Sequence, residues 1–411
     1  MRIAYCSLLL PEEKKLSERT KVRLSGISLH KVMTAFIAGI DANNDRPVSI
    51  FNIINTVNYP KFPQLVFHFE EWNHTQIPEH VDYHLGYINL FGIKYITQYL
   101  SMKKALTKWA KQSKECGIIC VHHIYQPMML AAVNVSKRYP HIKICLNTGD
   151  VPGKHGLVSQ RKRNIKQVLT ELFVERSISN LAQKFDCFVF VTRDMATAFE
   201  VESKPYRVVE CTYIEPEYAK RISAVKNATK DIFYAGAIRN EYGIDHLLRA
   251  FSMINDPNYR LLIAGGGAGV DLVKEYSCKD SRIVFLGFIS PQEVLRHQLE
   301  SRVLVSPRLS TLDYVKYSFP SKSVDSLATG VPYVAHHLPC DPPEYARYIN
   351  YPIDETDEGL RNKLVEICEL SEEERRKIGD RARNFILNEK NPVIMTKRVV
   401  DMWESLLKNN K

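Results

Sequence analysis

The chain has 411 residues, of which 45% are apolar and 25% charged, a composition typical of a soluble globular protein long enough for two or three domains. Its formal net charge of +10 indicates an anionic partner such as a phosphorylated substrate, an acidic lipid surface or nucleic acid. No RNP-like, zinc-finger or helix-turn-helix pattern accompanies the charge, so nucleic acid is the least favoured of these partners and is not expected.

Residues 3–10 form a short apolar run that meets a proline and lacks a small-residue cleavage site, which predicts a first strand and no signal peptide. No apolar run approaches the roughly 18 residues needed to cross a bilayer. The nine cysteines are scattered without a CxxC pair, so reduced thiols and no metal site are expected.

Strand-like apolar runs alternate with amphipathic stretches along the whole chain, which predicts parallel sheets covered by helices. Two sets of strands imply two doubly wound units. The strands are expected at residues 1–7, 48–54, 117–121, 142–146 and 187–191 in the first half, and at 231–235, 259–264, 282–286, 303–306 and 332–335 in the second.

The link between the two units is expected near residues 204–218, where prolines and mixed charge surround one short extended run. The predicted domains are therefore an N-terminal Rossmann-like domain, 1–205, and a C-terminal domain, 206–391. The last segment begins with a proline and carries an apolar side, which predicts a helix at 392–411 that returns to the first domain.

Three features of the first half follow predicted strands, where parallel sheets bind ligands. Gly26, before a helical stretch, permits close backbone approach, although a simple helix start is the alternative. His122 and His123 follow the strand at 117–121, and Asp150 follows the strand at 142–146. Structural histidines and a turn aspartate are the competing interpretations.

Residues 161–173 combine Arg161, Lys162, Arg163 and Lys166 with apolar residues at helical spacing. A basic amphipathic helix suits anionic lipid headgroups, so peripheral membrane contact is predicted there. The alternative is the core face of a domain helix.

The segment IFYAGAIRNEYGIDHLLRAF leads from a strand through Gly236 into a helix, and Arg239 is the one side chain of this turn that can clamp a diphosphate directly. An ordinary surface arginine is the alternative. Close backbone packing explains the glycines at 265–267 without a cofactor. Exposed backbone at Phe288 and Ile289 would read a nucleobase edge, or mark a plain strand exit.

The segment 317–345, YSFPSKSVDSLATGVPYVAHHLPCDPPEY, holds a loop that offers Lys322 to an anion and then opens a helix carrying Asp325. Helix N-termini attract phosphate, and a carboxylate one turn further on can accept hydrogen bonds from both ribose hydroxyls. The pattern suits a nucleotide diphosphate, and an ordinary loop, helix and strand is the alternative.

Four segments, YAGAIRNEYGIDHLLRAF, IAGGG, FLGFIS and YSFPSKSVDSLATGVPYVA, resemble in order and spacing the C-terminal domain of family-four retaining glycosyltransferases, in particular those that build bacterial capsular, exopolysaccharide or lipopolysaccharide chains. The resemblance implies the α/β GT-B fold, with two Rossmann-like doubly wound domains facing a cleft and the C-terminal helix returning to the N-terminal domain. It is specific only between about residues 230 and 345.

By this resemblance, Asp325 corresponds to the second glutamate of the family's Glu-seven-residues-Glu motif, which holds the donor ribose. The first glutamate falls on Tyr317, so the usual carboxylate to the donor sugar is missing. A histidine near His122 or His123 touches the donor sugar in the family, and Gly26 matches its glycine-bearing loop. The other residues expected on the donor side are Gly236, Phe288, Ile289, Arg308, Ser318, Phe319 and Ser321.

The family's arginine and lysine in the turn after the first strand of this domain fall on Ala237 and Tyr242, so that diphosphate clamp is missing too. Arg239, Lys322 and Arg308 are expected to compensate the diphosphate charge instead, because a partly closed site needs cations for two phosphates.

These observations predict a retaining hexosyltransferase-type glycosyltransferase that moves a sugar from a nucleotide-sugar, in the first instance a UDP-sugar, to a lipid-linked saccharide in cell-surface polysaccharide biosynthesis. Arg239, Lys322 and His123 are expected to be catalytic, with Gly26, His122 and Asp150 on the acceptor or sugar side. No DxD triplet is present, so no metal or other cofactor is expected. The enzyme is expected in the cytoplasm, peripherally on the inner face of the plasma membrane.

Two other functions would suit the same fold. A nucleotide-sugar epimerase or hydrolase needs a carboxylate pair near the sugar, and Tyr317 at one of these positions argues against it. A non-catalytic scaffold that binds a nucleotide-sugar is the other, since the usual carboxylate and cation positions are replaced.

Overall fold

The computed structural model describes residues 1–10, 27–153, 165–222, 225 and 228–408. The chain divides into two compact α/β units, Met1–Thr212 with Pro392–Lys411, and Tyr213–Asn391. The boundary expected at 205/206 is too early, because β10 (Tyr206–Val208) pairs in parallel with β9 (Cys187–Phe190) and so belongs to the first sheet.

The first unit is built on an eight-stranded sheet in the order β10-β9-β8-β7-β1-β2-β5-β4, in which only β4 and β5 pair antiparallel. Its central strands are buried along nearly their whole length, as parallel strands with helices on both faces must be. Besides β9 and β10, the strands are β1 (Arg2–Ser7), β2 (Ser49–Asn52), β4 (Glu70–Trp72), β5 (Asp82–His84), β7 (Gly117–His122) and β8 (Ile142–Thr148). A separate antiparallel pair consists of β3 (Val66–Phe67) and β6 (Tyr87–Ile88).

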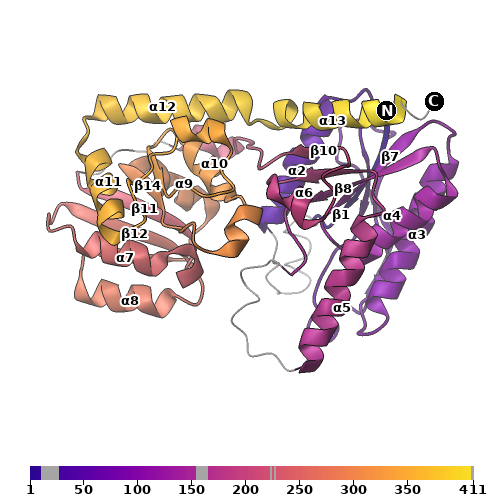
Figure 1. Ribbon diagram of the computed structural model, residues 1–411, viewed down its shortest axis with the longest axis horizontal. Helices are drawn as coiled ribbons and strands as arrows, with labels where there is room; N and C mark the ends of the chain where they lie inside the picture. Colours follow the sequence, from indigo (N-terminus) through magenta and orange to yellow (C-terminus); the bar gives the residue numbers. More distant parts are fainter. Residues whose placement is uncertain (11–26, 154–164, 223–224, 226–227, 409–411) are drawn as a thin grey trace. The chain divides into compact units, whose positions relative to one another are not determined.

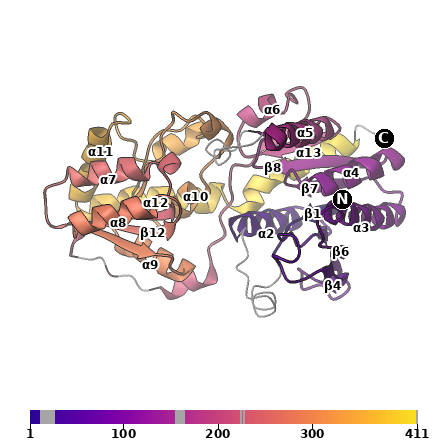
Figure 2. The same cartoon turned by 90° about the horizontal axis from the view of Figure 1, so that it is seen from below.

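Helices cover this sheet, and α3 packs along α4 while β6 lies against α3 (Figures 1 and 2). The final helix, α13, packs against α2, as expected for a C-terminal helix that returns to the first domain. A methyl group added at Gly39 of α2 would lie 2.4 Å from the Pro392 carbonyl oxygen, so this contact requires glycine. The helices are α2 (Ile27–Ala42), α3 (Lys94–Lys111), α4 (Gln126–Arg138), α5 (Ile165–Ala182), α6 (Asp194–Ala198) and α13 (Pro392–Lys408).

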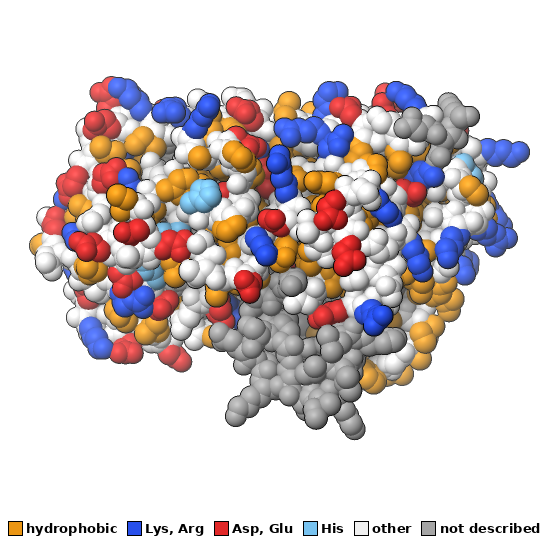
Figure 3. Space-filling view, viewed as in Figure 1, with side chains coloured by type: hydrophobic (Ala, Val, Ile, Leu, Met, Phe, Trp, Pro, Cys, Tyr) orange, Lys and Arg blue, Asp and Glu red, His pale blue; other side chains and the backbone are white. Residues whose placement is uncertain are grey.

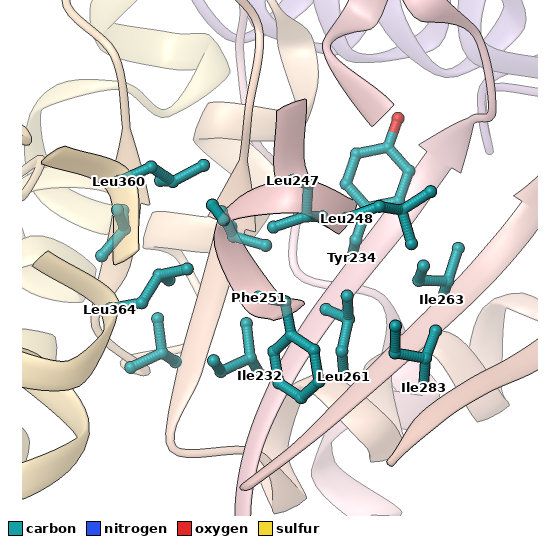
Figure 4. Close-up of a cluster of buried hydrophobic side chains, with 14 of the residues drawn as sticks. Ile232, Tyr234, Leu247, Leu248, Phe251, Leu261, Ile263, Ile283, Leu360 and Leu364 are labelled. Atoms are coloured by element: carbon teal, nitrogen blue, oxygen red, sulfur yellow. The ribbon is translucent and has the colours of Figure 1, made fainter. Parts of the chain in front are cut away.

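The second unit has a five-stranded parallel sheet in the order β13-β12-β11-β14-β15. Figure 4 shows Ile232, Leu261 and Ile283 from three neighbouring strands meeting apolar side chains from the helices, among them Phe251 and Leu364. The strands are β11 (Lys230–Ala237), β12 (Tyr259–Gly266), β13 (Ile283–Gly287), β14 (Val303–Ser306) and β15 (Tyr333–Ala335). All ten strands expected from the sequence are confirmed, with ends shifted by a few residues.

Helices of the second unit begin with side-chain caps where the sequence offers them. Ser290 and Ser371 each form a capping box with a glutamate three residues later. The helices are η1 (Glu217–Arg221), η2 (Asn240–Tyr242), α7 (Ile244–Ser252), α8 (Val270–Lys279), α9 (Pro291–Glu300), η3 (Asp313–Tyr317), α10 (Ser321–Leu327), η4 (Pro343–Arg347), α11 (Asp357–Glu369) and α12 (Glu372–Glu389).

The glycines after β12 let two strand ends approach closely. Gly265 has φ +133°, and a methyl group there would lie 1.8 Å from the Gly236 carbonyl oxygen of β11. Gly267 has φ +152°, and a methyl group there would lie 2.3 Å from the Ile238 carbonyl oxygen. Close backbone packing therefore accounts for these glycines.

Gly265→Ala is expected to destabilise the second unit far more than Gly287→Ala, which serves as its control. Both glycines have positive φ, which costs a non-glycine residue roughly 1–2 kcal/mol. Only Gly265 would add a backbone clash, since nothing lies within 4 Å of a methyl group at Gly287. Urea unfolding followed by circular dichroism measures the difference, and equal midpoints for the two variants would contradict the close-packing interpretation.

Candidate functional site

The strand order of the second sheet reverses between β11 and β14. The chain passes from β11 to β12 and β13 on one side and then returns to place β14 on the other side of β11. Ligands of doubly wound proteins bind beyond the carboxyl ends of the strands at such a reversal. Arg239 follows β11 and Arg308 follows β14, so the topology brings two arginines distant in sequence to this edge.

Arg308 is a buried guanidinium with donors that the described protein does not satisfy. Its residue is 6% exposed, and Nη1 donates to the Ser318 carbonyl oxygen at 3.2 Å. Nε and Nη2 are buried and meet no acceptor among the described residues. Because an unpaired buried donor is costly, and a charged one more so, these two N–H directions indicate a place for an anion.

Two tyrosine rings hold the Arg308 guanidinium. Its Cζ lies 4.9 Å from the ring centre of Tyr314 and 5.7 Å from that of Tyr242, within the range of cation–π attraction. Tyr242 occupies the position where the resembling family has a lysine. Tyr242 of the turn after β11 thus packs against a cation of the turn after β14. The stacking was not indicated by the sequence.

Lys322, on α10, reaches the end of β11. A methyl group added at Gly236 would lie 3.5 Å from Lys322 Cε and 2.8 Å from the Tyr234 hydroxyl. Lys322 is exposed, and Arg239 is half-buried. The structure therefore gathers Gly236, Arg239, Lys322 and Arg308 around one sheet edge.

Asp325 is exposed on α10, one turn after Lys322. Burial, followed by the charge of Asp325, raises the pKa of Tyr213 to about 12, and the same two causes raise the pKa of Tyr218. The carboxylate of Asp325 thus lies within electrostatic range of two phenol groups, which the sequence did not indicate.

Phe288 is 70% exposed beyond β13, and its ring lies over Gly266, where an added methyl group would meet it at 2.3 Å. A large exposed aromatic ring over a glycine is suited to stacking on a flat ligand. Ile289, the other residue expected here, is half-buried.

The residues of the loop before α10 differ in burial. Phe319 is buried with its ring edge-on to Tyr345, 5.4 Å between centroids, so its side chain belongs to the core rather than to a binding surface. The Ser318 carbonyl oxygen accepts from Arg308, whereas Tyr317 and Ser321 are half-buried. The side-chain role expected for Phe319 is corrected for this reason.

His122 is a core residue of the first unit. Its Nδ1 meets the Tyr5 hydroxyl and lies 3.3 Å from the Asn147 side-chain amide. Burial, with a smaller effect from His123, lowers the pKa of His122 to about 3, so the ring is neutral. The expectation that His122 contacts a sugar is wrong, since its ring points into the sheet core at 4% exposure.

His123 lies at the carboxyl end of β7 beside Asp150. Its backbone has φ +81°, unusual for a residue with a side chain, and its amide donates to the Asn147 carbonyl oxygen. His123 Nδ1 lies 3.2 Å from Asp150 Oδ2, and both side chains are partly exposed. The two first-unit candidates thus form one pair at neighbouring strand ends. Gly26 and the residues 161–164 lie outside the described residues.

A cavity of about 1370 Å³ lies in the first unit beside α2, β4 and β5. Trp72 lines it, stacked on His84 with 5.1 Å between ring centres, and its indole N–H is buried without an acceptor among the described residues. Histidines and carboxylates form much of the polar part of its wall, among them His30, Asp41, His68, Glu70, Glu71, His74 and His84. Aromatic faces beside many polar groups suit a carbohydrate.

His74, at the wall of this cavity, bridges two aspartates. Its Nδ1 lies 2.6 Å from Asp82 Oδ2 and its Nε2 lies 2.9 Å from Asp41 Oδ2. His80 Nε2 lies 3.0 Å from the other oxygen of Asp82. Within the described part of the chain, His74, His80 and Asp82 are the group whose ligand atoms lie close enough to hold a metal ion. The short contacts are those of a proton-sharing network.

Comparisons with known proteins agree with this architecture. Residues 217–385 match the family model described as glycosyl transferases group 1, which covers the second unit. Sucrose-phosphate synthase from Thermosynechococcus elongatus superposes with a TM-score of 0.63 at 14% identity, over 100% of both chains. No curated protein sequence matches the chain.

Two further solved structures have the same fold. One is described as trehalose-6-phosphate from E. coli bound with UDP-2-fluoro glucose, with a TM-score of 0.62 at 11% identity over 98% of this chain and 99% of that one. The other is the lipopolysaccharide outer core galactosyltransferase WaaB, with a TM-score of 0.59 at 13% identity over 99% and 100%. The chain therefore has the α/β GT-B fold and carries a group 1 glycosyltransferase domain.

The His74 network is expected to make stability depend on pH. Burial opposes protonation, but hydrogen bonds to Asp41 and Asp82 outweigh it and raise the pKa of His74 from 6.5 to about 9. This stabilisation is fully present below pH 6.5 and is lost as the pH rises through 9.

The wild type should therefore exceed His74→Gln in unfolding free energy by roughly 2–3 kcal/mol near pH 6, and the difference should shrink by pH 10. Urea unfolding at both pH values measures it, with His68→Gln as the control outside the network. A constant difference between wild type and His74→Gln would contradict the charged bridge.

Proposed function

We propose that the protein is a retaining glycosyltransferase that takes a sugar from a nucleotide-sugar, in the first instance a UDP-sugar, and transfers it to a lipid-linked saccharide in cell-surface polysaccharide biosynthesis. The single observation that carries the donor half is Arg308, whose buried guanidinium has two N–H donors that find no acceptor among the described residues, at the reversal of the second sheet. A diphosphate supplies the negative charge and the acceptor oxygens that this guanidinium lacks.

Three cations bind the diphosphate. Arg308 lies after β14, Lys322 lies on α10, and Arg239 lies in the turn after β11. As the bond between the sugar and the diphosphate breaks, negative charge grows on the leaving phosphate. Fixed cations stabilise that charge in the transition state more than in the ground state, which accelerates the reaction.

The nucleoside is assigned to residues around the same edge. Asp325, exposed one turn after Lys322, accepts from the ribose hydroxyls, and the exposed ring of Phe288 lies flat against the base with Ile289 beside it. Gly236 keeps the strand end open to the phosphates, because a side chain there would meet Tyr234.

Retention is what the resemblance to family-four retaining glycosyltransferases implies. Tyr317 stands where the resembling family has a carboxylate, so the sugar hydroxyls would meet a phenol that donates as well as accepts. In front-face transfer the acceptor hydroxyl gives its proton to the departing donor phosphate, and no separate protein base is needed. Within the first unit, His123, paired with Asp150, is the side chain assigned to contact with a sugar.

The acceptor is assigned to the first unit. Its cavity beside α2 and β4 offers the stacked Trp72 and His84 rings, an unpartnered indole N–H and several carboxylates, a set suited to a saccharide. A lipid carrier would bring this saccharide to the enzyme at the cytoplasmic face of the plasma membrane. The solved structure bound with UDP-2-fluoro glucose supports the choice of a UDP-sugar donor.

Substitution of the cations tests the donor site. Lys322→Ala should lower kcat/KM by about 100-fold, because it removes charge stabilisation of the leaving phosphate without disturbing the core. Arg308→Lys should weaken UDP binding by roughly tenfold, since an ammonium cannot present the planar fork. Calorimetry with UDP and rate measurements give both values.

Arg376→Ala, which removes an exposed arginine of α12, is the matched control for both. Thermal unfolding of Arg308→Lys separates a binding defect from a folding defect. Unchanged UDP affinity in Arg308→Lys together with an unchanged rate in Lys322→Ala would remove the diphosphate assignment.

A donor screen with membrane lipid extract as acceptor tests the reaction itself. Transfer should appear as a mass shift of a lipid-linked saccharide, with the anomeric configuration of the donor kept in the product. Free sugar or an epimer formed from the donor alone would support the hydrolase or epimerase alternative. UDP-sugar binding without any turnover would support the non-catalytic scaffold.

A further inference from the structure

The first unit exposes a continuous set of large apolar side chains around the start of α3. Phe91 is 83% exposed, Tyr95 57%, Ile96 56% and Leu100 54%. We call these residues, with the flanking exposed residues of β3, β6 and the loop before α3, the α3 surface. The flanking apolar residues are Leu65, Val66, Ile88, Leu90 and Ile93.

This surface is additional to the core face of α3. Met102, Leu106 and Trp109 are buried on the side of the helix that packs on the protein, whereas Ile96 and Leu100 point outward on the other side. Soluble proteins seldom expose contiguous apolar areas of this kind unless the area binds something. Helix α3 therefore carries apolar residues on its buried face and, in its first turns, on its outward face as well.

Lysines continue the same outward side of the helix. Lys103, Lys104, Lys108 and Lys111 are exposed, and no ion pair joins them to a described carboxylate. Between Asp82 and Asp150 the sequence has nine lysines and arginines and a single acidic residue, Glu115. The positive charge of the chain is thus concentrated on the elements that carry the apolar patch. In Figure 3, orange and blue side chains adjoin at the edge where Figure 1 places α3.

A groove of about 580 Å³ adjoins the α3 surface between α3, α4 and α5. Tyr95, Tyr99 and Leu130 line its apolar part, and Arg176 and Lys184 supply its cations. Lys103 Nζ lies 5.6 Å from the ring centre of Tyr99, so a cation also stands at the tyrosine rim. Tyrosines between apolar and basic side chains are typical of protein surfaces at the level of lipid headgroups.

We propose that the α3 surface docks on a lipid bilayer with anionic headgroups. Phe91, Ile96 and Leu100 enter the headgroup and acyl boundary, and the lysines further along α3 contact lipid phosphates. A second copy of this chain suits the surface less well, because a two-fold contact would bring the same lysines together. Nucleic acid would not use the exposed aliphatic side chains.

This inference extends the proposed function, because it gives the surface that would bring the enzyme to a lipid-borne acceptor. It differs from the contact predicted at 161–173, which lies mainly outside the described side chains. Vesicle binding is measured without donor or acceptor, so its outcome is independent of whether the proposed transfer reaction is correct.

Flotation of the full-length protein with vesicles tests the proposal. One set of vesicles contains phosphatidylcholine with roughly 30% phosphatidylglycerol, an anionic content at which surface charge attracts basic proteins. These vesicles should bind at least about tenfold more protein than vesicles of pure phosphatidylcholine. Phe91→Ser combined with Ile96→Ser should lower binding by about tenfold or more, and so should Lys104→Glu combined with Lys108→Glu. High salt should weaken the remaining binding of the apolar double variant.

Two control variants make the same kinds of substitution outside the α3 surface. Ile353→Ser removes an apolar side chain that is 91% exposed in the second unit, and Lys274→Glu reverses an exposed lysine of α8; both should bind vesicles like the wild type. Circular dichroism and thermal unfolding, measured on every variant, show that the variants are folded.

Equal binding of wild type and both double variants would overturn the proposal. A second pair of results would also overturn it. If the wild type does not bind vesicles and forms dimers in sedimentation velocity, and if Phe91→Ser with Ile96→Ser converts these dimers to monomers, the surface is a contact between copies of the chain.

Discussion

The proposed donor site depends on one interaction, the burial of the Arg308 guanidinium against two tyrosine rings, with two N–H donors that no described residue satisfies. A buried cation of this kind is costly in an empty site and becomes favourable when an anion pairs with it. Its position follows from the reversed strand order, which places the turn after β14 next to the turn after β11. Tyr242 stands in the turn after β11 where the resembling family has a lysine, and its ring contacts Arg308, which follows β14.

In the first unit, buried and partly exposed polar side chains lie in different places. Its core takes up His122 as a neutral ring, while His123 and Asp150 remain partly exposed at the neighbouring strand ends. His74 lies between two aspartates at the wall of a polar cavity, and α3 carries apolar and basic side chains outward. The proposed saccharide site and the proposed lipid contact thus lie on different elements of one domain.

The GT-B fold is shared by proteins with different activities. A sucrose-phosphate synthase and a lipopolysaccharide galactosyltransferase share it at 14% identity or less, so fold similarity alone does not select an acceptor. The proposals for this chain therefore rest on its own side chains, namely the tyrosines around Arg308, the Trp72 cavity and the α3 surface.

The sequence by itself determined the ten main strands, the two doubly wound units and the glycines at 265–267, because apolar periodicity and backbone freedom are local properties. It also pointed to Arg239 in the turn after β11 and to Lys322 and Asp325 near the start of α10, because a motif can mark both segments. Only the tertiary structure decided that Arg308 is held by Tyr242 and Tyr314, that Phe319 and His122 belong to the core, and that α3 is apolar on its outer side. These properties depend on which residues meet across strands and helices, and burial is fixed only when distant segments pack together.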